Sequence, residues 1–241
     1  MIRSLVLSLT ALGAVVALLA DTPAKALNNK SFVSGTGSDA NNCSTIPLAC
    51  ATFAHALTQT NAGGEITVVN TGDYQPLTID RSIDITNDGA GEASILAPGT
   101  GGIFVRAGKG DVIGLRGLVI DGQVFGMVGM EIDQASAVHI QNCVFRNFES
   151  SLDFTYAILS QPTNNLQIFI SDTIIFNNGS TAHSGGILIF PGTGGNAHLV
   201  LDRVHLENNV TALSVNASNG TPSGIGVYVI IRDSVDRKSV V

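Results

Sequence analysis

Four segments of the chain align with one another without gaps, and they decide its fold. They read VHIQNCVFRN from residue 138, IFISDTIIFN from residue 168, LVLDRVHLEN from residue 199 and VIIRDSV from residue 229. Their starts lie 30, 31 and 30 residues apart, and a weaker copy, VIGLRGLVID, begins at Val112. Repeats of this length are typical of solenoids, in which each unit packs only on its neighbours.

A second short apolar segment lies between successive copies, at 129–132, 157–159, 186–189 and 212–215. No single unit can bury its apolar face, but stacked units place like positions about 4.8 Å apart along a coil axis. The resulting columns are uniform in character: Val138, Ile168, Leu199 and Val229; Ile140, Ile170, Leu201 and Ile231; Phe145, Ile175 and Leu206; and the small residues Cys143, Thr173, Val204 and Ser234. We therefore predict an all-β fold, a single-stranded right-handed parallel β-helix (solenoid).

Asn147, Asn177 and Asn208 recur where each strand pair ends. Asparagine tolerates the left-handed backbone that turns a corner, and stacked side chains can bond along the coil. We interpret these residues as corners rather than as functional groups. Other β folds fit less well, because a sandwich has tight hairpin turns, a propeller repeats at about 40 residues or more, and a leucine-rich repeat needs a Leu/Asn pattern.

The composition fits one folded domain of many strands and turns. The chain has 241 residues, of which 44% are hydrophobic and 13% charged, with 27 glycines and no tryptophan. A disordered chain is more polar, and so many glycines are unusual in a helical bundle. The formal net charge is −7, and the sequence has no basic stripe that could follow a phosphate backbone. We therefore expect no nucleic acid partner.

The N-terminus has the three parts of a secretory signal peptide. Arg3 supplies the positive charge, 5–20 is an apolar run, and Ala24-Lys25-Ala26 offers a cleavage site. A membrane anchor is the alternative, but the apolar run is shorter than the roughly 20 residues of a span. We expect cleavage after Ala26 and a mature protein that is secreted, periplasmic or on the cell surface, with no membrane segment.

Export bears on the cysteines. Cys43 and Cys50 lie seven residues apart in a loop, and an oxidising compartment allows them to form a disulfide. Two buried thiols are the alternative. A metal site is not indicated, because neither a second cysteine pair nor a histidine cluster accompanies them. Cys143 stands in a strand pattern, which indicates a small core residue.

Residues 52–60 precede the repeats, and their apolar positions at 53, 54, 56 and 57 predict a short amphipathic helix. The following stretch 61–64, Asn-Ala-Gly-Gly, is expected to end this helix, and 65–69 to form a strand. A helix at this place would cover the apolar rungs and strand edges at the end of the coil. The predicted β-helix therefore has a short N-terminal capping α-helix.

The same region resembles the start of proteins in the pectin-lyase-like β-helix superfamily. The likeness rests on a helix ending in Ala62-Gly63-Gly64, a strand, the turn Gly72-Asp73-Tyr74 and the segment TIDRSIDI from Thr78. Secreted bacterial members without a characterised activity are the most similar, and their mature start resembles FVSGTGSDAN from Phe32. The resemblance extends over 31–235 and implies the fold. It implies no single activity, because the superfamily holds lyases, hydrolases, esterases, epimerases and adhesins.

The chemistries of that superfamily leave few traces in this chain. Its lyases have a calcium site of several carboxylates, whereas the exposed column here, Gln141, Ser171, Asp202 and Arg232, offers one carboxylate. The Asn-Thr-Asp segment, Asp pair and Gly-His-Gly of its pectin hydrolases are not found, and the nearest fragment, at 70–73, is interpreted as a turn. The two Asp and one Arg of its esterases are not evident. We expect no cofactor and no metal ion.

The best cluster of titratable residues is Asp202, His205, Glu207 and Arg232, with Arg146 as a further member. Residues 205 and 207 are expected to point the same way on one strand, roughly 7 Å apart, with 232 one rung from 202. A histidine beside carboxylates and an arginine fits general acid–base work. An ordinary solvated face with ion pairs across rungs is the alternative, and it is favoured. His55, His183 and His198 give weaker indications.

The sequence therefore favours a non-catalytic extracellular or cell-surface role, either adhesion or contact with an extracellular polysaccharide or cell-surface glycan. Outward aromatic residues such as Phe169, Phe176, Phe190 and Tyr228 are candidates for stacking on sugars. A polysaccharide lyase or hydrolase is the first alternative, and it rests on the resemblance of fold. A purely structural surface rod is the second.

The expected organisation is a signal peptide over 1–26, an N-terminal cap with a loop and short helix over 27–64, and a β-helix over 65–235. The repeat pattern stops at Val235 in mid-repeat, so we expect the coil to be truncated. The tail 236–241 can be encoded by the sequence of a common sequencing-library adapter. We therefore interpret the tail as non-native.

Overall fold

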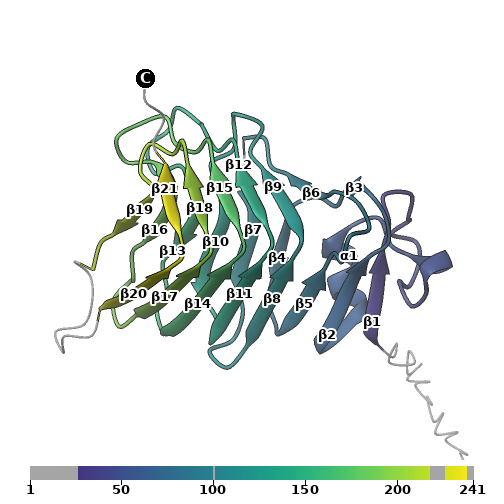
Figure 1. The fold of residues 1–241 in the computed structure, drawn as a ribbon. Coiled ribbons are helices and arrows are strands. Elements are labelled where there is room, and N and C mark those ends of the chain that lie inside the picture. The colour runs from purple at the N-terminus through teal and green to yellow at the C-terminus, as the bar shows by residue number, and fades with distance from the viewer. Residues whose placement is uncertain (1–26, 100, 218–225, 238–241) are drawn as a thin grey trace, which may run out of the picture.

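The chain forms a parallel β-solenoid of about seven turns in a computed structural model, which describes residues 27–99, 101–217 and 226–237 (Figure 1). Strands of successive turns lie side by side along the coil, and one short helix stands near its N-terminal end. The predicted all-β parallel coil is thereby confirmed. The signal peptide predicted over 1–26 lies outside the described residues.

Three parallel sheets form the walls of the coil, and each turn passes through them in the same order. The first sheet contains β1 (Asn28–Val33), β2 (Thr60–Val68), β5 (Ile83–Thr86), β8 (Val112–Arg116), β11 (Ala137–Gln141), β14 (Asn165–Ser171), β17 (Asn196–Asp202) and β20 (Val227–Arg232). The second contains β3 (Gly72–Asp73), β6 (Ala93–Leu96), β9 (Leu118–Asp121), β12 (Val144–Arg146), β15 (Ile174–Phe176), β18 (His205–Glu207) and β21 (Val235–Arg237). The third contains β4 (Leu77–Ile79), β7 (Gly101–Arg106), β10 (Val128–Gln134), β13 (Tyr156–Ser160), β16 (Gly185–Ile189) and β19 (Leu213–Val215).

The strand register reproduces the predicted apolar columns. In the first sheet, one column runs through Val138, Ile168, Leu199 and Val229, and the next through Ile140, Ile170, Leu201 and Ile231. In the second sheet, Phe145 pairs with Ile175, which pairs with Leu206. As far as β17 and β18, the members of these columns are buried in one continuous core. Burial of these columns is the main favourable contribution to folding.

The weaker copy is shifted by one residue from its predicted alignment. Ile113, and not Val112, pairs with Val138, while Gly114 pairs with His139. Because side chains alternate across a strand, a shift of one residue exchanges the inward and outward positions. The predicted alignment turned Gly114 toward the core, whereas in the structure it lies on the outer face.

The predicted asparagine corners are confirmed. Asn147, Asn177 and Asn208 have φ angles of 61°, 55° and 49°, in the left-handed region. The Asn208 Nδ2 donates to Asn177 Oδ1 at 2.7 Å, so the side chains bond along the coil as predicted. The small column is buried at Cys143, Thr173 and Val204, and burial raises the pKa of the Cys143 thiol to about 11. Cys143 is therefore a core residue, as predicted.

The predicted helix is confirmed as α1 (Phe53–Gln59). Thr52 Oγ1 accepts a hydrogen bond from the His55 N–H at its start, and Phe53, Ala56 and Leu57 are buried. The prediction that 61–64 end this helix was wrong, because β2 begins directly after it at Thr60. Residues 61–64 belong to β2, where its pairing with β1 is irregular. The pattern that looked like a helix stop is therefore a bulge in a strand.

The N-terminal cap contains a strand that the sequence analysis did not predict. β1 pairs in parallel with β2 and adds a further strand to the first sheet. Beyond it, a loop with one 3-10 turn (Ile46–Leu48) carries the disulfide between Cys43 and Cys50. The Phe32 N–H donates to Cys43 O, and the Cys50 N–H donates to Phe32 O. The bridged loop is thus tied to β1.

The predicted tail is partly described. Asp236 and Arg237 belong to β21, and 238–241 lie outside the described residues. Asp236 pairs with Leu206, in a column that otherwise holds Ile95, Ile120, Phe145 and Ile175. That the tail is non-native and the coil truncated stays a prediction. In the part of the chain that the structure describes, none of the helices has the length and apolar character to cross a membrane.

Candidate functional site

The predicted titratable cluster is divided between two faces of the coil. Asp202 and Arg232 are neighbours in one column of the first sheet, as predicted. His205 and Glu207 lie on β18 of the second sheet. The corner at Arg203, with a φ of 54°, separates the two pairs. The four side chains therefore do not share one face.

Ion pairs already engage much of this cluster. Arg203 lies 2.6 Å from both Asp172 and Asp202, and His205 Nδ1 lies 3.4 Å from Glu207 Oε1. Arg146 pairs with Asp121 at 2.7 Å, and Phe176 stands between it and Glu207 in the column. Exposed pairs of this kind are typical of a solvated face. A catalytic role for the cluster stays a prediction.

The four aromatic residues proposed to contact sugars do not form one platform. Phe169 stacks on His139, and Tyr228 lies against His198, both on the first sheet. Phe176 belongs to the second sheet, whereas Phe190 directly follows β16 of the third. Of these four, Phe190 lines a concave surface that has further aromatic groups.

That surface, here called the aromatic hollow, has a volume of about 200 Å³. Its lining residues are Phe154, Tyr156, His183, Leu188, Phe190, Ser214 and Asn216. They come from β13, β16 and β19 of the third sheet and from the loops that precede and follow those strands. The strands form the floor, and the loops form the rim.

Two successive loops between the second and third sheets shape the rim. Residues 147–155 lead into β13, and 177–184 lead into β16. The Phe154 N–H donates to His183 O at 3.1 Å, and Ser180 Oγ donates to Ser150 O at 2.6 Å. One loop therefore rests on the next by direct hydrogen bonds, as strands do within the sheets.

A buried pair of asparagines anchors these loops at their start. Asn178 Oδ1 accepts from the Phe148 N–H at 3.1 Å, and Asn178 Nδ2 donates to Asn209 Oδ1 at 2.8 Å. Asn209 Nδ2 in turn donates to Ile175 O at 2.8 Å. Both side chains are buried, so each amide is held by bonds that water cannot replace. This inner asparagine ladder fixes where the loops leave the coil.

Phe154 is displayed at the rim in a strained backbone conformation. Its φ is 64°, a left-handed value that is unfavourable for a bulky residue, and its side chain is 61% exposed. Its ring lies nearly parallel to that of His183, with centroids 6.0 Å apart and planes 15° from parallel. Strained residues cluster at binding sites, so this exposed ring is a candidate for contact with a ligand.

Tyr156 places a hydroxyl group at the hollow without a partner. Tyr156 is only 4% exposed, and within the described residues its hydroxyl makes no hydrogen bond. Burial raises its pKa, so the hydroxyl stays protonated and able to donate. Its neighbour in the next strand is Gly185, which has no side chain to cover it. The Tyr156 oxygen is not among the buried side-chain atoms that lack a partner, so it reaches the surface of the hollow, where a ligand atom can bond to it in place of water.

The hollow is lined mainly by groups that stack or form hydrogen bonds, and it includes one imidazole, that of His183. Its lining residues include no Asp, Glu, Lys or Arg. Aromatic rings and Leu188 offer apolar surface, while Tyr156, Ser214 and Asn216 offer polar groups at the edge. The arrangement suits a ring with one apolar face and a hydroxylated rim.

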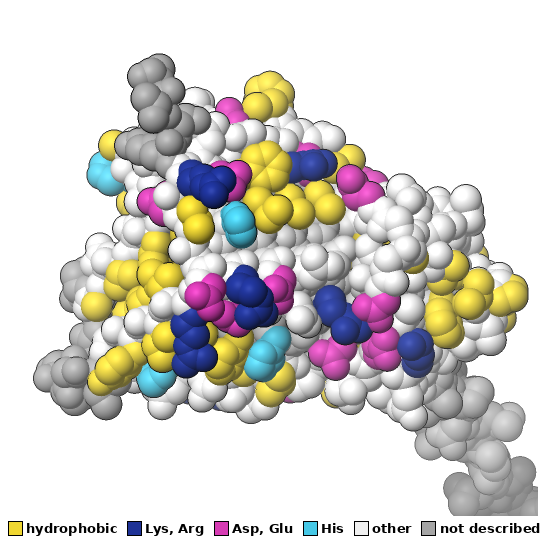
Figure 2. Space-filling view, in the orientation of Figure 1, with side chains coloured by type: hydrophobic (Ala, Val, Ile, Leu, Met, Phe, Trp, Pro, Cys, Tyr) yellow, Lys and Arg dark blue, Asp and Glu magenta, His cyan; other side chains and the backbone are white. Residues whose placement is uncertain are grey.

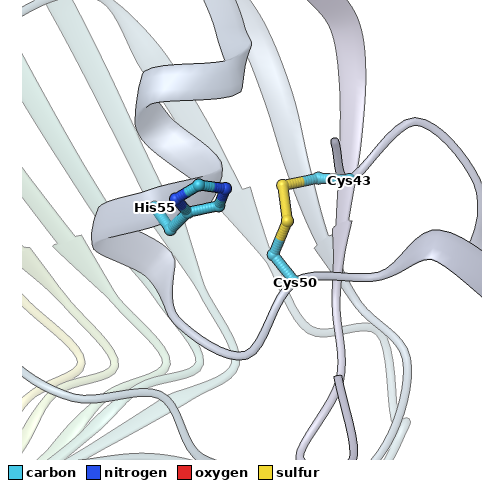
Figure 3. Close-up of side chains that lie close together, drawn as sticks. All are labelled: Cys43, Cys50 and His55. Carbon is cyan, nitrogen blue, oxygen red and sulfur yellow. A yellow bond between two sulfur atoms is a disulfide. The ribbon is translucent and has the colours of Figure 1, made fainter. Parts of the chain in front are cut away.

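A metal site is not supported at the cap. Figure 3 shows the side chains of Cys43, Cys50 and His55 close together beside the disulfide. One ligand-type atom of each lies within 4.8 Å of those of the other two. The two sulfur atoms are joined in the disulfide, so neither is the thiolate that binds metal ions. His55 Nε2 lies 3.1 Å from Asn41 O, to which it can donate. These residues are therefore structural.

Sequence reasoning missed Phe154, Tyr156 and the role of His183. The loops that carry them have no repeat pattern, so no column could be constructed for them. One signal was present in the doublets Asn177-Asn178 and Asn208-Asn209, whose second members form the inner ladder. Comparison of the chain with protein-family models, curated proteins and solved structures gave no match. The resemblance to the pectin-lyase-like superfamily therefore stays a prediction.

Proposed function

We propose that this protein is an exported, non-catalytic β-solenoid that contacts a neutral glycan through the aromatic hollow. The observation that carries the proposal is the Tyr156 hydroxyl, which an otherwise buried side chain presents at an aromatic-lined surface and which has no bond within the described residues. Export rests on the signal peptide pattern of residues 1–26, which implies a secreted or cell-surface location.

A pyranose ring matches the chemistry of the hollow. One face of such a ring presents C–H groups, which pack on aromatic rings such as Phe154 and Phe190, while its hydroxyls bond to polar groups at the edge. The volume of about 200 Å³ lies below the roughly 300–1,000 Å³ of sites for drug-sized ligands. The hollow therefore has room for one sugar residue, and the rest of a glycan would run along the outer face of the coil.

Charge favours a neutral sugar over a uronate. A uronate carboxylate needs a basic partner, and the lining residues contain neither Lys nor Arg. The whole chain carries a formal charge of −7, which further opposes an acidic polymer. The lyase alternative, which requires polyuronate substrates, is thus less well supported.

The absence of carboxyl groups from the lining also favours binding over hydrolysis. Glycoside hydrolysis ordinarily uses two carboxyl groups on either side of the bond that is cleaved. No lining residue of the hollow is an Asp or a Glu. The residues present can hold a sugar, but they do not supply the pair of carboxyl groups.

The test is a glycan array on the folded full-length chain, combined with a polysaccharide degradation assay with calcium present. We expect binding of neutral glycans and no degradation. The matched variants are Phe154→Asn, which removes a rim ring, and Phe125→Asn, which removes a ring that is 68% exposed on the neighbouring loop outside the hollow. Binding should fall in the first and persist in the second. Degradation would establish the enzyme alternative. An array without any binding would favour the alternative that the protein is a purely structural rod.

A further inference from the structure

A second hollow, on the outer face of the first sheet, has a different chemistry. It has a volume of about 350 Å³, and its lining includes Glu65, Asp84, Gly114, Arg116, His139 and Gln141, here called the polar hollow. Figure 2 shows acidic and basic side chains gathered over the N-terminal strands of this sheet. The polar hollow lies on a different sheet from the aromatic hollow and shares no residue with it.

The polar hollow exists because one position in a column lacks a side chain. The column runs through Glu65, Asp84, Gly114, His139 and Phe169 on successive strands. Adjacent strands are about 4.8 Å apart, so Asp84 and His139 stand two spacings apart, and of these two side chains only the end of Asp84 reaches over Gly114 into the gap between them. A planar group placed over Gly114 would continue the column at the ordinary spacing.

One wall of the gap is a flat ring whose orientation is fixed. His139 stacks on Phe169 with centroids 4.8 Å apart and planes 8° from parallel. Phe169 covers one face of the imidazole, and the other face borders Gly114. This exposed face favours a flat partner, and a guanidinium group stacks on aromatic faces better than a round ammonium group does.

The opposite wall supplies a carboxylate without a partner. Asp84 Oδ1 leans over Gly114, at the place that the Cβ of a larger residue would occupy. Within the described residues Asp84 makes no hydrogen bond or ion pair. Glu65 on the next strand accepts bonds from Lys30, Thr67 and Thr86 through Oε1 alone.

The charged groups around the gap leave it acidic. Lys30 pairs with Glu65 at 3.2 Å, and Arg116 is drawn to Asp88 at 2.7 Å. Asp84 remains as the carboxylate that is not balanced by a cation. A positively charged group is therefore favoured over a neutral or an acidic one.

We propose that the polar hollow binds a guanidinium group, stacked on His139 and paired with Asp84. The guanidinium has the required flatness and charge, and its fork of N–H donors matches a carboxylate. Its source is either an arginine side chain of a protein partner or a small free guanidinium compound. This proposal does not depend on glycan binding, and each of the two can be tested and rejected without the other.

The experiment is an NMR titration of the full chain with methylguanidinium, with N-acetyl-Ala-Arg-Ala-amide and with the matched lysine peptide. We expect saturable shifts at His139 at millimolar concentration, with the arginine peptide binding at least about fivefold tighter than the lysine peptide. Binding of methylguanidinium but not of the peptide identifies a free compound as the source. Equal binding of the two peptides, or no binding of either arginine-like probe, overturns the proposal.

Variants test whether the guanidinium group binds at the polar hollow. Asp84→Asn should weaken binding at least about tenfold, whereas Asp153→Asn, which removes a carboxylate from a distant loop, should not. Gly114→Val should fill the gap and abolish binding, whereas Ser171→Val adds a valine to the same sheet outside it. A strand accepts valine readily, and urea denaturation of Gly114→Val separates loss of binding from loss of folding. Unchanged binding in both Asp84→Asn and Gly114→Val overturns the proposal.

Discussion

The two hollows of this coil are built in opposite ways. The polar hollow lies within a regular column of strand residues, where Gly114 lacks the side chain that its neighbours carry. The aromatic hollow arises where loops add Phe154 and His183 beside the strand residues Tyr156 and Leu188. A solenoid can thus acquire a site by omission from a column or by addition at a turn. The first depends on strand register, and the second depends on what anchors the loops.

The largest expected effect comes from the anchor of the loops. Asn178→Leu leaves the Phe148 N–H without an acceptor and Asn209 Oδ1 without a donor, both of them buried. We expect a loss of about 3 kcal/mol in the free energy of unfolding, measured by urea denaturation. Glycan binding at the aromatic hollow should fall with it, while guanidinium binding should persist in the fraction that stays folded.

The outer ladder provides the control for this variant. Asn177→Gly keeps a left-handed turn possible and removes a bond that is partly exposed to water, so it should change stability by less than about 1 kcal/mol. If the two variants were equally destabilised, the inner asparagines would not be the anchor.

A smaller effect is expected from relieving strain at the rim. Phe154→Asn places a residue that tolerates left-handed backbone at a φ of 64°. We expect the free energy of unfolding to rise by up to about 1 kcal/mol while glycan binding falls. Thermal denaturation with and without glycan measures both. A destabilised variant would mean that Phe154 contributes packing rather than binding.

Gly114→Val should be nearly neutral for the fold. Its Cβ meets the end of the Asp84 side chain, which can move aside, and a β-branched residue suits a strand. We expect a gain of about 0.5 kcal/mol or less, measured by urea denaturation against Ser171→Val. Retained glycan binding in this variant would show that the two hollows act independently. A marked loss of stability would show that the gap is structural.

The smallest expected effect is a difference in the pH dependence of stability between a carboxyl group of the third sheet and one of the first sheet. Burial and the charge of Asp133 raise the pKa of Glu131 on the third sheet. Burial also opposes ionisation of Glu65 at the polar hollow, but bonds from Thr67, Thr86 and Lys30 outweigh it and lower the pKa. A raised native pKa means that stability falls as pH rises from the ordinary value toward it, and a lowered pKa means that stability is lost as pH falls toward it.

Glu131→Gln and Glu65→Gln should therefore shift the pH dependence of stability in opposite directions. Relative to the unsubstituted chain, Glu131→Gln should become more stable at neutral pH and Glu65→Gln less stable. Urea denaturation between pH 3 and pH 8 measures both. Shifts of the same sign would contradict the assigned environments.

The sequence predicted the coil because its apolar columns recur at a nearly constant period. Ile168 and Leu199 had to lie one above the other once the repeat was aligned, and Asn177 had to occupy a corner. The helix at 53–59 followed from its apolar spacing in the same way. The features that could be predicted are those that recur with the period of the repeat.

Neither hollow could be predicted from the sequence, and the reason differs between the two. The alignment of the weaker copy was displaced by one residue, which turned Gly114 inward beside Ile140 and concealed the gap. The aromatic hollow depends on loops of unequal sequence, whose positions are set by the buried bond between Asn178 and Asn209. The titratable cluster at 202–232 appeared compact in the alignment because a corner at Arg203 does not interrupt the sequence pattern.

The most direct test of the proposed function is glycan binding by Tyr156→Phe, measured by calorimetry with the strongest glycan from the array. This variant removes one hydroxyl that bonds to no described residue, so stability should be unchanged. We predict that affinity falls by about tenfold, because the hydroxyl bonds to the sugar in the complex. Unchanged affinity in a fully folded variant would contradict the account, because the ligand would then not reach the hollow.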